Sequence, residues 1–445
     1  MRLVILLVCF FIYKSLCSEK NIELEVIYEK TFDEPVVDVI FDTATVTIEE
    51  AKMMGWKNLE GKKDDERIKI EYPKVIFIPE KISYRKDDTQ IKEIRFYNKK
   101  GELIKKLQVE TDWSKREKVV ISPNGKYIGI SKQPTEDNPE NTGGVLYKAD
   151  GTLIWEKKTK DSPIAVSDEG YVLSGELDWK PEGTDGSFFI YNPEGEKIKT
   201  IENPYRKENI GKGFGKFSND GKYVILMFTN YKNSIIQLIT KSGDILWENE
   251  IKYKCNIPNE FDLQENVGLI ATTTQVMDGY KEYIFFIEWN GGLKWVIPLE
   301  NLGRAIIIKI FSESKKACIV STSCDIYCIN LLTGETLWKY KESWAPLKRD
   351  KNWLKFFDNK PRYAEGTIMG RYIYIIGKYK DVHSFPPKDW YASTLFVFDF
   401  ENNKLIQKIE YPDKRITLIS RQNEVFISDI DSNKIFKVKI KEAEK

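Results

Sequence analysis

A unit of about 45 residues recurs along this chain, and this recurrence constrains the fold more than any other feature. Each unit ends in an apolar segment, a turn with glycine and a second apolar segment, as in EIRFYNKKGELIKKL (93–107) and DIYCINLLTGETLWKY (325–340). The turn glycines lie 50, 44, 48, 49 and 42 residues apart, at Gly101, Gly151, Gly195, Gly243, Gly292 and Gly334. Strand-like units at such a period are typical of a radial or linear β array.

Each unit also has an earlier half with a turn of its own. Examples are KVVISPNGKYIGIS (118–131) and FGKFSNDGKYVILMF (214–228). Four short strands per unit, with turns at two fixed places, predict an all-β propeller blade. Helical spacing is nearly absent. The one predicted helix is TIEEAKMMGW (47–56), with Thr47 as its cap and Glu50 three residues later.

The two ends of the chain together predict a closed ring. The final unit supplies three strands, RITLISRQ, NEVFISDI and NKIFKVKI, whereas the N-terminal NIELEVIYEK (21–30) is a lone strand. Pairing the two ends completes the last blade and removes the exposed edges at the junction. This count gives eight four-stranded blades. Seven stays the alternative, because residues 30–92 are irregular.

The first 17 residues have the pattern of a secretory signal peptide. Arg2 supplies a positive start, residues 3–13 are all apolar, and Ser15 and Cys17 are small residues spaced as at a cleavage site. The apolar run is too short for a membrane span, which needs about 20 residues. We therefore expect a signal peptide at 1–17, a single propeller domain at 18–445, no transmembrane segment, and a secreted, periplasmic or cell-envelope protein. A lipid-anchored Cys17 is the alternative.

The charge balance excludes partners that depend on a strong net charge. Removing residues 1–17 takes away Arg2 and Lys14 and leaves 67 basic against 68 acidic side chains. No acidic or basic tail remains to indicate a nucleic-acid or anionic-lipid partner. Nucleic acid is therefore not expected to bind.

The segment CINLLTGETLWKY (328–340) resembles the tryptophan-docking repeat of quinoprotein-like (PQQ-type) propellers, and ISPNGKYIGIS resembles WD40-like strands. The resemblance implies a role for the tryptophan: it packs over a turn of the adjacent blade. The matching residues are Trp155, Trp247 and Trp338, four residues after their glycines, and Trp295, three after. Lys105 and Lys199 stand at this place in two other units, so the docking girdle is expected to be incomplete.

The resemblance also bears on cofactors. Quinoprotein dehydrogenases of this superfamily use a vicinal cysteine disulfide and a calcium cluster, and this sequence has no adjacent cysteine pair. The chain is more similar to the cofactor-free branch, which includes an outer-membrane assembly lipoprotein with an eight-bladed scaffold. No cofactor is predicted.

Other catalytic patterns are also missing from the sequence. His383 is the only histidine, so no histidine cluster can bind zinc. DIDSN (429–433) begins like a calcium loop but lacks its glycine and distal glutamate, and it falls where a hairpin turn is expected. No catalytic or metal-binding residue is therefore predicted.

The exported part contains four cysteines: Cys255, Cys318, Cys324 and Cys328. In KKACIVSTSCDIYCIN (315–330) a turn near Ser323 places Cys318 opposite Cys328 on two antiparallel strands. Such a pair lies within the span of a disulfide, which makes the two a candidate disulfide. Buried free thiols are the alternative.

The long connections locate a candidate binding site. The longest are residues 132–143, 175–186, 203–213, 343–362 and 379–393, and in a four-stranded blade all of them open on one face. Loops carry function more often than the scaffold does. The candidate ligand-binding residues are Trp179, Trp344, Arg349, Trp353, His383, Lys388, Trp390 and Tyr391. The alternative is that these rings pack under their own loops.

These patterns predict a non-catalytic binding or assembly scaffold for a protein partner. The alternative is a protein that binds or degrades extracellular polysaccharide through the same face. Two carboxylates about 5–9 Å apart in the central funnel would favour the enzyme.

Overall fold

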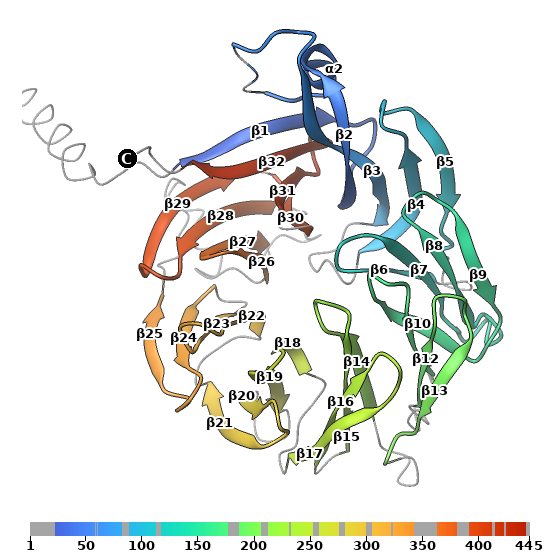
Figure 1. The fold of residues 1–445 in the computed structure, drawn as a ribbon, viewed down its shortest axis with the longest axis vertical. Helices are drawn as coiled ribbons and strands as arrows, with labels where there is room; N and C mark the ends of the chain where they lie inside the picture. Colours follow the sequence, from blue (N-terminus) through green and yellow to red (C-terminus); the bar gives the residue numbers. More distant parts are fainter. Residues whose placement is uncertain are drawn as a thin grey trace, which may run out of the picture.

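The computed structural model describes residues 23–57, 59, 61–81, 89–112, 117–176, 187–205, 212–230, 233–251, 258–275, 281–299, 305–321, 324–341, 363–380, 391–411, 414–421 and 424–441. These residues form eight four-stranded antiparallel sheets, arranged as blades around a ring (Figure 1). The predicted eight-bladed β-propeller is confirmed, and the seven-bladed alternative is wrong. No helix in the described part of the chain is long and apolar enough to cross a membrane.

The first four blades follow one another along the chain, each with its first strand nearest the ring axis (Figure 1). Blade 1 contains β2 (Asp38–Thr47), β3 (Arg67–Lys81), β4 (Gln90–Tyr97) and β5 (Leu103–Gln108). Blade 2 contains β6 (Glu117–Ile121), β7 (Tyr127–Lys132), β8 (Gly143–Lys148) and β9 (Leu153–Lys157). Blade 3 contains β10 (Asp161–Val166), β11 (Val172–Glu176), β12 (Phe188–Tyr191) and β13 (Lys197–Ile201). Blade 4 contains β14 (Lys212–Phe217), β15 (Tyr223–Thr229), β16 (Ser234–Thr240) and β17 (Ile245–Ile251).

Blades 5 to 7 continue in the same order, and the last blade combines strands from both ends of the chain. Blade 5 contains β18 (Pro258–Gln264), β19 (Gly268–Gln275), β20 (Lys281–Glu288) and β21 (Leu293–Leu299). Blade 6 contains β22 (Ala305–Phe311), β23 (Lys316–Ser321), β24 (Ile326–Asn330) and β25 (Thr336–Tyr340). Blade 7 contains β26 (Tyr363–Met369), β27 (Tyr372–Lys380), β28 (Tyr391–Asp399) and β29 (Lys404–Tyr411). Blade 8 contains β30 (Ile416–Arg421), β31 (Glu424–Asp429), β32 (Lys434–Lys441) and β1 (Glu23–Thr31).

The middle strands of a blade are buried on both faces, because each blade lies between two others. In β15, Ile225 and Met227 pack in the core shared with blade 5, whereas Val224 and Leu226 pack in the core shared with blade 3. Such strands have continuous apolar runs, and the outer strands alternate instead. The core is thus a series of separate inter-blade layers.

Pairing of β1 with β32 closes the ring. The two strands are antiparallel, from Glu23 opposite Lys441 to Thr31 opposite Lys434. At the same junction the rings of Phe41 in blade 1 and Phe426 in blade 8 stack with centroids 3.8 Å apart. The predicted closure by the N-terminal strand is therefore confirmed.

An excursion of blade 1 covers the other edge of β1. It contains the predicted helix, α2 (Ile48–Met53), whose N-cap Thr47 forms a capping box with Glu50. After the helix, the backbone N–H of Glu29 donates to the carbonyl of Gly55 at 3.1 Å. A Cβ built on Gly55, which has φ of +95°, would lie 2.2 Å from the carbonyl oxygen of Glu29, so only glycine fits there.

Arg95 ties the connection between β1 and β2 to blade 1. Its side chain is 4% exposed, and Nη1 donates to the two carboxylate oxygens of Asp33 at 2.7 and 2.9 Å. The guanidinium also binds Glu34 and Glu93. Charge-assisted bonds from all three guanidinium nitrogens to three carboxylates fix geometry as well as adding energy. The closing strand is therefore anchored at its exit from blade 8.

We expect Arg95→Met to lower the free energy of unfolding by about 3 kcal/mol, because it leaves the buried carboxylate of Glu93 without its guanidinium partner. Urea denaturation of the mature chain measures this change. Arg67→Met is the control, since Arg67 is exposed at the start of β3 and should change stability by less than about 0.5 kcal/mol. Equal shifts for the two variants would contradict an anchoring role for Arg95.

Candidate functional site

A β-bulge recurs at one place in blades 1 to 7, between the third and fourth strands. The residue that follows the bulge on each outer strand stands four positions after a residue with positive φ. We call these side chains the docking residues: Lys105, Trp155, Lys199, Trp247, Trp295, Trp338 and Gln407. In blade 5 the residue with positive φ is Gly291 and not Gly292, so Trp295 keeps the same spacing as the others.

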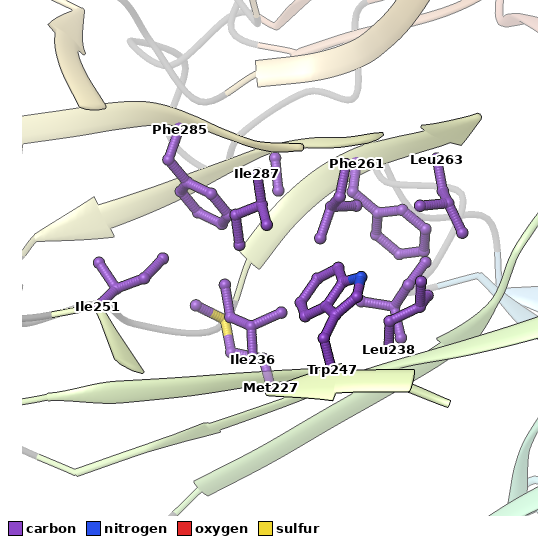
Figure 2. Close-up of a cluster of buried hydrophobic side chains, with 12 residues drawn as sticks. Met227, Ile236, Leu238, Trp247, Ile251, Phe261, Leu263, Phe285 and Ile287 are labelled. Carbon is purple, nitrogen blue, oxygen red and sulfur yellow. The ribbon is translucent and has the colours of Figure 1, made fainter. Parts of the chain in front are cut away.

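The docking tryptophans lie against the following blade. A Cβ built on Gly195 would be 2.8 Å from Cδ1 of Trp155, and one on Gly291 would be 2.8 Å from Cβ of Trp247. Trp247 also enters the core between blades 4 and 5 (Figure 2). Trp295 approaches Gly334 and donates from Nε1 to the carbonyl of Leu331 at 2.9 Å.

Trp338 takes the same place between blades 6 and 7. Its ring lies 5.2 Å from that of Phe400, which directly follows β28. Trp155, Trp247, Trp295 and Trp338 therefore fill the gaps between blades.

In blades 1 and 3, lysine takes the docking position. The amine of Lys105 donates to the carbonyl of Gly151 at 2.5 Å and lies 4.9 Å from the ring centroid of Tyr147. A Cβ built on Gly243 would be 2.6 Å from Cβ of Lys199. The long aliphatic stem of each lysine covers the turn, and the amine of Lys105 also reaches a carbonyl and a ring. The girdle is thus continuous at these two blades, in contrast to the expectation from tryptophans alone.

Lys30 of the closing strand was missed in the sequence. Its amine lies 3.5 Å from a Cβ built on Gly101, the turn glycine of blade 1. The N-terminal strand therefore supplies a side chain at the junction of blades 8 and 1 as well as hydrogen bonds. No fixed spacing from a turn marks it, because β1 follows no turn glycine of its own.

The long connections open on one face of the ring, which we call the long-loop face: the face where each first strand begins and each second strand ends. The described connection at 133–142 has internal hydrogen bonds. Backbone groups of Thr135 and Asn138 bond reciprocally at 3.2 Å, and Nδ2 of Asn141 donates to the carbonyl of Gln133 at 3.2 Å. This loop is held in one shape by its own polar groups.

The predicted ligand-binding residues lie mostly outside the described residues. These are Trp179, Trp344, Arg349, Trp353, His383, Lys388 and Trp390. Tyr391 is the first residue of β28, and its side chain also lies outside the described set. The described strands β27 and β28 flank one of these segments. β27 ends and β28 begins at the long-loop face.

A polar cluster on this face of blade 2 was missed in the sequence. Lys132, the last residue of β7, lies opposite Glu117 in the sheet, and its amine binds Glu156 of β9 at 2.9 Å. Gly143, opposite Lys132 in the sheet, carries no side chain, whereas Gly144 faces the other side of the sheet, where a Cβ would lie 2.2 Å from Cδ of Pro163. No local spacing marks the cluster, because its three side chains come from three strands that meet only in the assembled sheet.

The two carboxyls of this cluster have pKa values shifted in opposite directions. Burial raises the pKa of Glu117, the negative charges of Glu110 and Glu156 raise it further, and Lys132 and a backbone N–H oppose the shift. The hydrogen bond and charge of Lys132 lower the pKa of Glu156. Of the two carboxyls, Glu117 is therefore the more easily protonated.

The described part of the chain holds no group of three or more histidine, cysteine or acidic side chains placed to bind a metal ion. Residues 430–433 form the turn between β31 and β32, as predicted for DIDSN. In blade 6, Cys318 lies directly opposite Cys328, and both are buried free thiols in this structure, as is Cys324. Cys255 lies outside the described residues.

Comparison with known proteins gives a likeness of fold. No protein-family model matches the sequence, and no curated protein does. The crystal structure of BamB from Moraxella catarrhalis is similar, with a TM-score of 0.51 and 12% identity over 95% of this chain and 99% of that chain. The computationally designed Ika8 protein has a TM-score of 0.51 and 9% identity over 94% of this chain and 100% of its own. These structures thus share the β-propeller fold with this chain.

We expect Trp247→Ala to lower the free energy of unfolding by about 3–4 kcal/mol, because it empties a largely buried site between blades 4 and 5. Leu246→Ala is the matched control on the same strand. Leu246 is 47% exposed, so its truncation should cost less than about 1 kcal/mol. Urea denaturation of both variants gives the comparison, and similar losses would show that the docking position has no special weight.

Proposed function

We propose that this protein is an exported, non-catalytic binding or assembly scaffold for a protein partner, with the long-loop face as its working surface. The observation that carries the proposal is the closed ring, in which the connections at 132–143, 175–186, 203–213, 343–362 and 379–393 begin and end at one face, while the α2 excursion between β2 and β3 leaves from the opposite face. A rigid frame with variable loops on one side suits recognition. The docking residues hold the frame and leave the loops free to differ from blade to blade.

Two further observations support this function and an envelope or extracellular location. Residues 1–17 have the pattern of a secretory signal peptide. The repeat resembles the cofactor-free branch of quinoprotein-like propellers, and the fold is shared with BamB. Fold likeness alone does not determine function, so the loop residues must be tested directly.

Affinity capture from the native envelope fraction tests the proposal. The bait is the mature chain, beside a variant in which Trp179, Trp344, Trp353 and Trp390 are changed to alanine. We expect a defined protein partner to be retained by the mature chain and lost with the variant, because large aromatic side chains dominate protein interfaces. Quantitative mass spectrometry of the eluted proteins provides the measurement.

The control variant removes four exposed apolar side chains from the outer strands, which lie near the opposite turns. Leu103, Leu153, Leu293 and Leu337 are 38–50% exposed and are changed to alanine together. This variant should retain the partner. Loss of the partner from both variants would place the contact elsewhere than on the long-loop face, and retention of polysaccharide without protein would overturn the scaffold.

Action on an extracellular polysaccharide is the second candidate. The Glu117 and Glu156 pair is the observation behind it, although Glu156 lies on the outer strand β9 and not in the central funnel. One carboxyl has a raised pKa and the other a lowered pKa, with Lys132 beside them. Glycosidases use a protonated acid with an ionised carboxylate. In this arrangement Glu117 would be the acid and Glu156 the base or nucleophile.

If this second candidate is correct, the mature chain releases reducing ends from envelope polysaccharide, and Glu117→Gln lowers the rate by about 100-fold or more. Glu49→Gln, an exposed acid on α2, is the control and should leave the rate unchanged. A reducing-end assay gives the rates. No release by the mature chain would eliminate this function.

A further inference from the structure

Three cysteines of blade 6 share one buried face. One buried cysteine lies on β23, one in the following turn and one on β24, and each is 0% exposed: Cys318, Cys324 and Cys328. They pack in the layer between blades 6 and 7, together with Phe396 and Phe398 of β28. The three thiols therefore lie in one apolar layer, but only two of them are paired by the sheet.

The register selects the pair. Cys318 lies directly opposite Cys328 in the antiparallel ladder of β23 and β24. Ser321 lies three residues after Cys318. Its N–H donates to the carbonyl of Asp325 at 3.0 Å, so Ser321 and Asp325 are a hydrogen-bonded pair of the ladder. Hydrogen-bonded and non-hydrogen-bonded pairs alternate, so Cys318 and Cys328 form a non-hydrogen-bonded pair. Their Cα atoms are then about 4.5 Å apart, within the range of a disulfide.

Cys324 has no such partner in the ladder. It lies in the turn with φ of +60°, and its N–H donates to the carbonyl of Ser321 at 2.8 Å. No residue of the described β23 is paired with it in the register. The sheet thus distinguishes two cysteines from the third.

We propose that Cys318 and Cys328 form a cross-strand disulfide when the chain folds in an oxidising compartment, and that Cys324 stays a thiol. The oxidant is a disulfide of the glutathione class. The Cys318 thiolate attacks one sulfur of the oxidant and releases one thiol. The Cys328 thiolate then attacks the mixed disulfide at Cys318 and releases the second thiol, so that two protons and two electrons leave with the two released thiols.

Burial sets the time at which the bond can form. The apolar layer raises the pKa of Cys318, and it raises the pKa of Cys328 to about 11, so both are protonated once blades 6 and 7 have packed. Thiolates and not thiols are the nucleophiles in this exchange. Because Phe396 and Phe398 cover the pair in the folded chain, the oxidant must reach it while the β23 and β24 hairpin is still uncovered. This inference does not depend on the proposed function.

The test uses the mature chain, unfolded in denaturant and refolded with either oxidised glutathione or excess dithiothreitol. The oxidised sample is then denatured and alkylated without reduction, and its intact mass is measured. We expect two alkyl groups, at Cys255 and Cys324, against four in the reduced sample. The oxidised form should also melt about 3 °C higher, because an 11-residue loop is closed in the unfolded chain.

Three alanine variants assign the pair, because trypsin cannot separate these cysteines: no lysine or arginine lies between Lys316 and Lys339. Cys324→Ala should keep the bond and show one alkyl group. Cys318→Ala and Cys328→Ala should each show three. The mass is read on denatured chains, so a variant that folds poorly still gives an answer. Four alkyl groups in the oxidised mature chain would overturn the proposal, as would a bond that survives in Cys318→Ala.

Discussion

The hydrogen bonds between β1 and β32 are the interaction on which the rest of the structure depends. A ring of blades is stable only if the last blade meets the first, because each inter-blade layer needs two walls. Here the join is made by strands from opposite ends of the chain. It is reinforced by the stacked rings of Phe41 and Phe426 and by the carboxylates that Arg95 gathers.

The same junction explains why blade 1 is unlike the other blades. Its excursion carries α2 and returns past β1, where Gly55 accepts a hydrogen bond from Glu29. The closing strand is therefore held on both edges. A free strand edge is a site for unwanted pairing, and this arrangement covers part of it.

One repeated geometry supports different side chains around the ring. The bulge in the outer strand aims a residue towards the next blade whether that residue is Trp155, Lys105 or Trp295. Tryptophan fills the gap with a ring, and lysine fills it with a stem whose amine reaches a carbonyl. Backbone geometry, more than residue type, defines this position, which is why the fold tolerates very different sequences.

The local pattern of the chain was sufficient to predict the period, the eight blades, the closing strand, the capped helix and the register of Cys318 with Cys328. Each of these depends on residues close in sequence or on the alternation of strands, which physical chemistry restricts to few solutions. Lys30 against Gly101, Arg95 with Asp33, and Lys132 between Glu117 and Glu156 were decided only by the tertiary structure. Their partners come from different blades, or from strands that meet only once the sheet is assembled, and burial then sets their hydrogen bonds and pKa values.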